Sequence, residues 1–177
     1  MSLSLSILRD RVILLNQLKV DIIGMSCNTA HILHPALARI SKAEFPSLIQ
    51  LVTQTVVDKN ISKIGLLATP TTIKSNIYQN SLKQIGIVCC TLSLSLQRET
   101  DILIRDIISG HLNKQKNKNK LENLGKTLIR KFQVEGIILG CTELPLLFPI
   151  NRFKIPIFDS LSILADHLTI TSLNVKI

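Results

Sequence analysis

The sequence has no tryptophan, a single tyrosine and no cysteine pair at Cys-x-x-Cys spacing among its 177 residues. No apolar run reaches the roughly 18 residues that a membrane-spanning helix needs. Charged residues already occur at Arg9, Asp10 and Arg11, where a signal peptide needs an apolar stretch. Membrane insertion and secretion are therefore disfavoured, and we expect a cytoplasmic protein that has no membrane partner.

Apolar residues, mostly isoleucine and leucine, make up 46% of the chain, which is typical of a folded protein. The length suffices for one large hydrophobic core or two small ones. Strand-like apolar runs alternate with amphipathic segments of helix length, which favours an α/β fold with a parallel sheet. The expected strands are 20–25, 47–52, 63–68, 86–91, 135–140 and 155–158. The expected helices are 5–18, 28–42, 53–60, 72–84, 97–109, 120–132 and 160–169.

The formal net charge of +9 raises the question of nucleic-acid binding. Much of this charge lies in residues 111–120, which hold four lysines and no acidic residue. Nucleic-acid readers usually add aromatic platforms or a recognisable module, and this segment has neither. We therefore interpret it as a solvated lysine- and asparagine-rich loop, and expect no nucleic-acid partner.

The four cysteines do not have the density or spacing of a disulfide framework. Cys27, His31 and His34 could share one helical face, so a metal site has to be considered. Zinc sites usually bring close ligand pairs, which are missing here, and we expect no metal. Cys89 and Cys90 end an expected strand, and ordinary packing accounts best for both.

The two remaining cysteine segments, 21–31 and 135–145, look like two copies of one strand–cysteine–helix motif. Each runs an apolar strand into a cysteine, Cys27 or Cys141, and then turns at once into an expected helix. Asn28 with Thr29 marks the start of one helix and Thr142 marks the other. Backbone N–H groups and the positive helix end favour an anion at such a junction. Two matched thiols suggest an acid and a base that act on one bound carboxylate.

Four motifs occur in the order of a known family and cover nearly the whole chain. They are Met-Ser-Cys-Asn-Thr-Ala-His at 25–31, Leu-Leu-Ala-Thr-Pro-Thr-Thr-Ile at 66–73 with Tyr78, Leu-Gly-Cys-Thr-Glu-Leu-Pro at 139–145, and Ile-Pro-Ile-Phe-Asp-Ser at 155–160. The chain resembles the aspartate/glutamate racemase superfamily, most closely aspartate racemase and its broad-specificity amino-acid racemase relatives. The resemblance implies cofactor-independent racemisation, without pyridoxal phosphate.

The resemblance also implies an architecture of two small flavodoxin-like α/β domains with the active site between them. Residues 53–154 would form the second domain, and residues 1–52 with 155–177 would form a discontinuous first domain. The family's N-terminal strand and glycine-rich loop are missing before the first cysteine motif, so the first domain is expected to be truncated. Its sheet would hold 20–25, 47–52 and 155–158, with a bared edge that makes a homodimer plausible.

The site prediction assigns Cys27 and Cys141 as the two bases, one for each enantiomer. Asn28, Thr29 and Thr142 would donate to the substrate carboxylate. Thr69, Thr71 and Thr72 follow strand 63–68, at the end of a parallel strand where α/β sheets place ligands. The alternative role for each threonine is a helix cap, and for Thr71 and Thr72 this explanation is nearly as good. Glu143 and His31 would tune the thiols, although Glu143 could simply favour a first helical turn and His31 could be a packed, hydrogen-bonded residue.

The predicted function is cofactor-independent racemisation of an acidic amino acid, aspartate or glutamate, by proton transfer between two cysteines at Cα. The alternative is an inactive, truncated remnant of such an enzyme. A hydantoin racemase or a one-cysteine decarboxylase of the same superfamily fits less well, because both cysteines are present and Cys-Thr-Glu resembles the aspartate racemase pattern.

Overall fold

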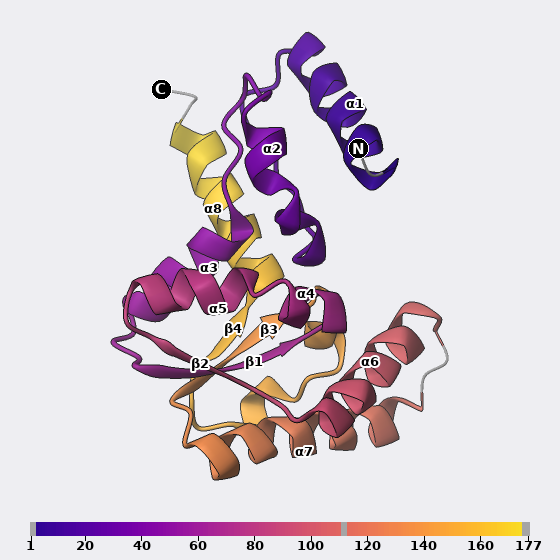
Figure 1. Ribbon diagram of the computed structural model, residues 1–177, viewed down its shortest axis with the longest axis vertical. Coiled ribbons are helices and arrows are strands. Elements are labelled where there is room, and N and C mark those ends of the chain that lie inside the picture. Colours follow the sequence, from indigo (N-terminus) through magenta and orange to yellow (C-terminus); the bar gives the residue numbers. More distant parts are fainter. Residues whose placement is uncertain (1–2, 111–112, 175–177) are drawn as a thin grey trace.

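A four-stranded parallel sheet forms the centre of the molecule in the computed structural model, which describes residues 3–110 and 113–174 (Figure 1). The strand order is β2-β1-β3-β4. The strands are β1 (Lys63–Ala68), β2 (Val88–Thr91), β3 (Gly136–Gly140) and β4 (Ile157–Asp159). The sheet and its covering helices confirm the predicted α/β class.

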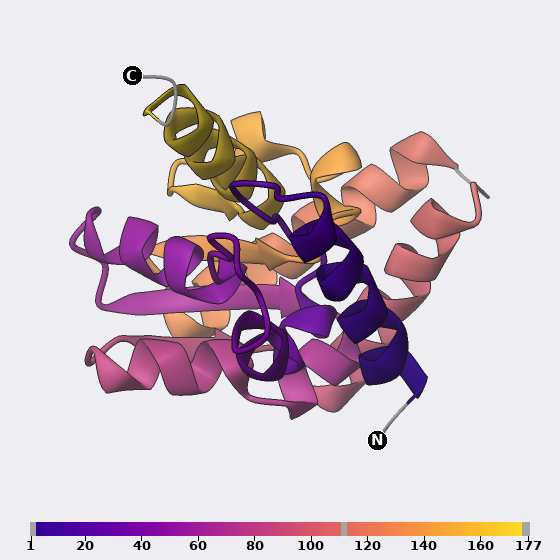
Figure 2. The same ribbon diagram turned by 90° about the horizontal axis from the view of Figure 1, so that it is seen from above.

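Helices cover both faces of this sheet, because alternate residues of the central strands point to opposite sides. Ile64, Leu66 and Ile138 pack against α3 (Leu48–Val57), α5 (Ile77–Gln84) and α8 (Ser160–Asn174). Figure 2 shows α3 between α5 and α8. Residues of the opposite parity, among them Leu67 and Leu139, pack against α6 (Leu94–Ile108) and α7 (Lys114–Phe132).

The strand order reverses at β1: β2 is added on one side of this strand and β3 on the other. The chain leaves β1 through α4 (Pro70–Lys74) and α5 on one face to reach β2. It then returns through α6 and α7 on the other face to β3, on the opposite side of β1. The carboxyl ends of β1 and β3 therefore lie at a topological switch point, where connecting segments diverge and leave room for a ligand.

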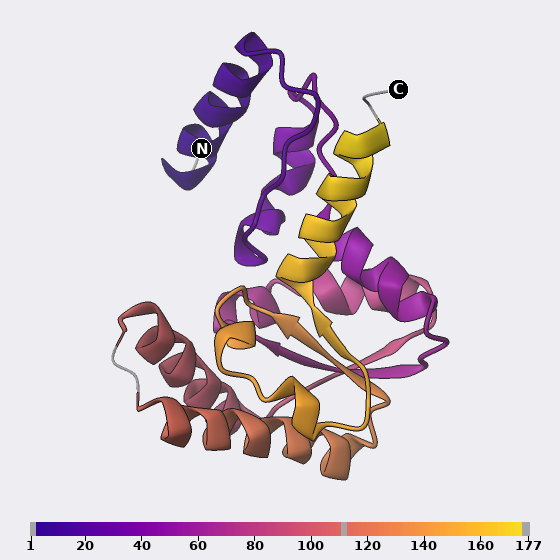
Figure 3. The same cartoon turned by 180° about the vertical axis from the view of Figure 1, so that it is seen from behind.

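The N-terminal segment forms a smaller layer of its own. It contains helix α1 (Leu3–Gln17), the short η1 (Thr29–Ile32) and α2 (His34–Ala38), and α1 and α2 pack around a cluster of Val12, Ile23 and Leu37. Figure 3 shows α1 and α2 beside α8, away from the sheet. Two further 3-10 turns, η2 (Leu144–Leu146) and η3 (Ile150–Arg152), connect β3 to β4. Within the described residues, none of the helices combines the length and hydropathy needed to cross a bilayer.

Two predicted strands were wrong. Residues 48–57 form helix α3, because Ser47 caps it by accepting a hydrogen bond from the Gln50 N–H, and apolar residues recur at helical spacing. Residues 20–25 form no strand, and they share one isolated bridge, between Ile22 and Glu44. The strand predicted beside them, 47–52, lies largely in helix α3, so the two segments cannot pair in a sheet.

The predicted sheet of the first domain is therefore absent from the described residues. Its third strand, predicted at 155–158, appears as β4 and pairs with β3, in the same sheet as β1 and β2. The described residues thus form no separate first-domain sheet with a bared edge, and β4 is an edge strand of the four-stranded sheet. The division into 1–52 with 155–177 and 53–154 stays a prediction.

Two predicted helices are interrupted. The helix expected at 28–42 consists of η1 and α2, because Pro35 begins a new helix and cannot continue an old one. The helix expected at 72–84 begins earlier and divides into α4 and α5 at Asn76, which is left-handed with φ 56°.

The prediction of a lysine- and asparagine-rich loop at 111–120 was also wrong for the residues that the structure describes. Residues 114–120 are the first two turns of α7, and 111–112 lie outside the described residues. Asn113 caps this helix by accepting a hydrogen bond from the Lys116 N–H at 3.1 Å. Lysine is a good helix former, and Leu121, Leu124 and Leu128 anchor the helix on the sheet.

Candidate active site

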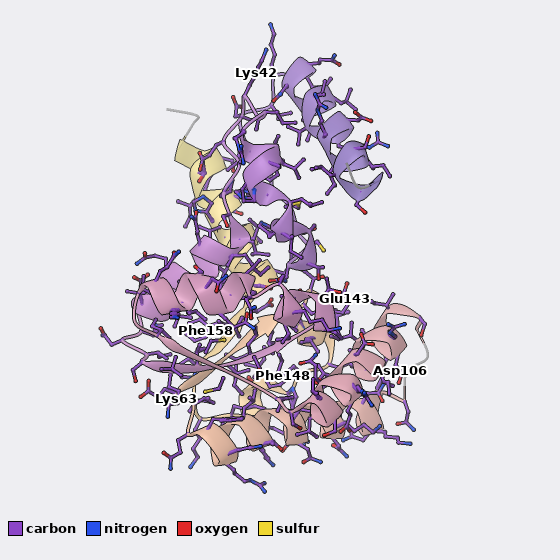
Figure 4. The ribbon with its side chains drawn as sticks, viewed as in Figure 1. Lys42, Lys63, Asp106, Glu143, Phe148 and Phe158 are labelled. Atoms are coloured by element: carbon purple, nitrogen blue, oxygen red, sulfur yellow. The ribbon has the colours of Figure 1, made fainter. Side chains whose placement is uncertain are left out.

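A pocket of about 190 Å³ lies where β1 and β3 end. Figure 4 shows Glu143 beside α4 in this region. The lining combines both cysteine segments with the turn after β1 and one side of α6. It consists of Cys27, Asn28, Thr29, Thr69, Ile104, Ile108, Gly140, Cys141, Thr142 and Glu143. Seven of the ten predicted site residues are in this set, and the pocket can hold one small molecule.

Cys141 follows β3 directly and is held by the sheet. Its side chain is 6% exposed, and Sγ donates a hydrogen bond to Glu143 Oε2 at 2.9 Å. Burial raises the pKa of the Cys141 thiol to about 12, and the hydrogen bond to the Glu143 carboxylate acts in the same direction. The proximity of Cys27 adds a smaller contribution to the higher pKa of Cys141. Cys141 is therefore a protonated thiol in the resting site.

Cys27 lines the same pocket, but no strand of the sheet holds it. It is exposed and follows an irregular segment, instead of the strand that was predicted. Its neighbours Asn28 and Thr29 start η1 and make the side-chain contacts that hold this turn over the sheet.

Asn28 is the buried link between the two halves of the pocket. Its Oδ1 accepts a hydrogen bond from the Tyr78 hydroxyl at 2.6 Å, and its Nδ2 donates to Ser160 Oγ at 2.9 Å. Ser160 in turn donates to the Leu139 carbonyl at 2.9 Å, two residues before Cys141. The side chain that was predicted to bind the substrate thus also ties the Cys27 turn to β3.

Three predicted threonines form a cluster of hydroxyl groups. Thr29 Oγ1 lies 3.0 Å from Thr69 Oγ1 and 2.8 Å from Thr72 Oγ1, and the latter two are 3.0 Å apart. Thr69 also caps α4 by accepting the Thr72 N–H. Thr29 and Thr69 line the pocket, and fully buried Thr72 supports them from behind. Thr71 is exposed and is not among the lining residues.

Thr142 and Glu143 complete the side of the pocket that Cys141 occupies. Thr142 Oγ1 donates to Glu143 Oε2 at 3.0 Å, so this carboxylate oxygen receives two side-chain hydrogen bonds. Glu143 therefore contacts the Cys141 sulfur directly, and the tuning role of this carboxylate stays a prediction.

His31 holds backbone groups together and makes no contact with a sulfur that would tune it directly. Its Nε2 accepts the Leu48 N–H at 3.0 Å, so Nδ1 carries the proton and donates to the Cys27 carbonyl at 2.8 Å. Burial lowers the pKa of His31 to about 4, and the ring is neutral. His34 contacts the Phe45 carbonyl. No group of three metal-binding side chains occurs in residues 3–110 and 113–174.

Several lining or supporting residues were not predicted. Ile104 and Ile108 are one turn apart on α6, a spacing that marks a helix face without showing what that face contacts. Gly140 permits close approach of β1 and β3, since a Cβ there would lie 3.1 Å from the Ala68 Cβ. Tyr78 and Ser160 lay within the quoted motifs, and only the fold shows that both contact Asn28.

Comparison with known proteins gives one family and a set of solved structures. A family profile described as Asp/Glu/hydantoin racemase matches residues 3–168. The structure of an aspartate racemase homologue from Pyrococcus horikoshii is 25% identical, with a TM-score of 0.83, and the match covers 95% of this chain and 74% of that one. The aspartate racemase of Picrophilus torridus is 24% identical, with a TM-score of 0.80 over 97% of this chain and 70% of that one, which supports the fold.

A glutamate racemase from a Synechococcus strain is 29% identical over 138 residues, which are 78% of this chain and 49% of the relative. The chain thus spans about half the length of that relative.

Proposed function

The chain belongs to the Asp/Glu/hydantoin racemase family, and on that premise we propose that it interconverts the two enantiomers of an amino acid without a cofactor. Cys27 and Cys141 act as the two bases, on opposite faces of the substrate. The observation that supports this most is their common pocket: two thiols, 114 positions apart in the sequence, line one cavity of about 190 Å³.

The proposed reaction moves one proton at each face of Cα. In one direction the Cys27 thiolate removes the Cα proton, and the Cys141 thiol delivers its proton to the opposite face. Cys27 ends as a thiol and Cys141 as a thiolate, and the reverse direction exchanges these roles. The high pKa of Cys141 suits its starting role as the proton donor.

Proton removal requires stabilisation of the negative charge that develops on the substrate carboxylate. The hydroxyl groups of Thr29, Thr69 and Thr142 are the available side-chain donors in the lining. Thr72 orients the first two through its hydrogen bonds. A well-placed donor of this kind contributes roughly 3–4 kcal/mol to transition-state stabilisation.

The names of the relatives point to aspartate and glutamate as the first substrates to test. These acids agree with the acidic substrate predicted from the sequence. The proposed partner is the amino-acid substrate, the homodimer stays a prediction, and we place the enzyme in the cytoplasm.

The test follows racemisation and the exchange of Cα hydrogen in deuterated water, starting from each enantiomer of several amino acids. Cys27→Ser and Cys141→Ser should each lower racemisation by about a hundredfold or more, because a serine hydroxyl is a far weaker base. Cys90→Ser is the matched control, since Cys90 is not among the residues lining the pocket. Unchanged racemisation in either of the first two variants would contradict the assignment.

Absence of exchange in the wild-type chain would instead favour the inactive alternative. A cooperative unfolding transition and a single species in solution would show that such a negative result comes from a folded protein.

A further inference from the structure

One wall of the pocket is apolar and comes from a single helix. Ile104 and Ile108 of α6 are one turn apart and both line the cavity. Ile104 is 2% exposed and Ile108 is 65% exposed, so the wall runs from the core to the rim of the pocket. Gln97 fixes this helix against the sheet by donating to the Ala68 carbonyl at 2.8 Å. The wall is therefore a built part of the site.

The charged group in the pocket lining has the wrong sign for an acidic side chain. Glu143 contributes a carboxylate, and none of the ten described lining residues is a lysine, an arginine or a histidine. Arg105, the nearest cation on α6, lies on the exposed side of that helix and pairs with Asp101 at 3.0 Å. A second substrate carboxylate in this pocket would compete with the α-carboxylate for the hydroxyl groups of Thr29, Thr69 and Thr142, or would meet Glu143 or the two isoleucines.

Resting on the proposed racemisation, we infer that the site takes amino acids with uncharged, apolar side chains, which lie against Ile104 and Ile108. The hydroxyl groups of Thr29, Thr69 and Thr142 serve the α-carboxylate, and the two sulfurs flank Cα. The wall formed by Ile104 and Ile108 is then the surface that contacts the amino-acid side chain. Burial of apolar side-chain atoms there favours binding, whereas a charged group loses its hydration without gaining a partner.

The isoleucine wall suits a short apolar side chain. We take 2-aminobutyrate and valine as its test substrates, and a cavity of about 190 Å³ accommodates either of them. In an apolar pocket each methylene group changes the preference by roughly tenfold or more.

The experiment measures kcat/KM for Cα hydrogen exchange with 2-aminobutyrate, valine, aspartate and glutamate, using the wild-type chain. The inference predicts values for 2-aminobutyrate at least about tenfold above those for aspartate. Aspartate or glutamate as the better substrate would overturn the inference and leave the proposed racemisation intact. Exchange with none of the amino acids would overturn both.

A charge-introducing variant tests whether the isoleucine wall is responsible. Ile108→Lys places a cation at the rim, where 65% exposure makes the change compatible with folding. It should raise the ratio of aspartate to 2-aminobutyrate exchange by about tenfold or more. Ile102→Lys is the matched control, since Ile102 is on the same helix, 56% exposed and outside the lining. An equal ratio in the two variants would contradict the role of Ile108.

Discussion

The two cysteines reach one pocket from regions that are built differently. Cys141 stands at the end of β3, in the interior of a parallel sheet, with helices packed on both faces. Cys27 stands in an irregular turn, whose nearest backbone pairing is the single bridge between Ile22 and Glu44. The sheet positions Cys141 through backbone hydrogen bonds, whereas side-chain hydrogen bonds position Cys27.

Three side chains connect the Cys27 turn to the sheet and its helices through five hydrogen bonds. Asn28 reaches Tyr78 and Ser160, Thr29 reaches the turn after β1, and His31 bridges the Cys27 carbonyl and the start of α3. Each of these contacts is a hydrogen bond that depends on the side chain of Asn28, Thr29 or His31. The geometry between the two sulfurs therefore depends on a few replaceable groups, although global stability depends on the sheet.

The largest expected effect concerns the core beneath Cys141. Ile138→Ala removes a fully buried side chain from the centre of β3 and should cost about 4 kcal/mol of unfolding free energy. Ile23→Ala, in the small N-terminal cluster, should cost about half as much because fewer buried residues surround it. Urea unfolding followed by circular dichroism measures both. Equal losses would show that the two regions do not differ as described.

The next effect concerns the pH dependence of the region around Cys27. His31 has a pKa of about 4 in the folded chain and about 6.5 when unfolded, so the unfolded state binds the proton first. Stability should fall as the pH is lowered from about 6.5 towards 4, by about 3 kcal/mol in total. His31→Gln keeps one donor and one acceptor without titrating, and its unfolding free energy should change less over this range. A parallel decline in both proteins would refute the prediction.

The Asn28 link should matter less for stability and more for the local geometry. Asn28→Ala leaves the buried Tyr78 hydroxyl and Ser160 without a partner at this position, which should cost about 2 kcal/mol. Hydrogen exchange should increase in residues 24–32 and stay unchanged in β3. Asn80→Ala changes an exposed asparagine of α5 and is the control. Increased exchange across both regions would mean that Asn28 is not a local link.

The smallest expected effect is on the reactivity of Cys141. Glu143→Gln removes the carboxylate that contributes to the raised pKa of Cys141, so this pKa should fall while burial still holds it above the ordinary value. Alkylation of Cys141 at pH 8.5, measured by mass spectrometry, should accelerate several-fold. Glu135→Gln, before the opposite end of β3, is the control. Identical alkylation rates in both variants would show that Glu143 does not influence the reactivity of Cys141.

The sequence was sufficient to predict the half of the site that the sheet supports. Continuous apolar runs place β1 and β3 correctly, and the order of elements places Thr69, Cys141 and Thr142 at the ends of parallel strands. The same reasoning gave a strand at 47–52, because Leu48, Ile49 and Leu51 are compatible with a strand as well as with a helix. Only the Ser47 cap and the packing against α8 decide for the helix.

The other half depends on contacts between distant residues, which local patterns do not contain. Asn28 and Ser160 are 132 residues apart, and nothing in either segment specifies their hydrogen bond. Ile104 and Ile108 read as an ordinary helix face, and only the position of α6 beside the carboxyl ends of the strands turns that face into a wall of the pocket. For the same reason Thr71, next to Thr72 in the sequence, lies outside the site.

The central claim is that the two sulfurs face one small pocket, and a short bifunctional thiol reagent tests it directly. In a Cys89→Ala/Cys90→Ala chain, dibromobimane should bridge Cys27 and Cys141, giving one cross-linked peptide pair by mass spectrometry of the folded protein. Recovery of only singly modified Cys27 and Cys141 peptides would contradict the claim.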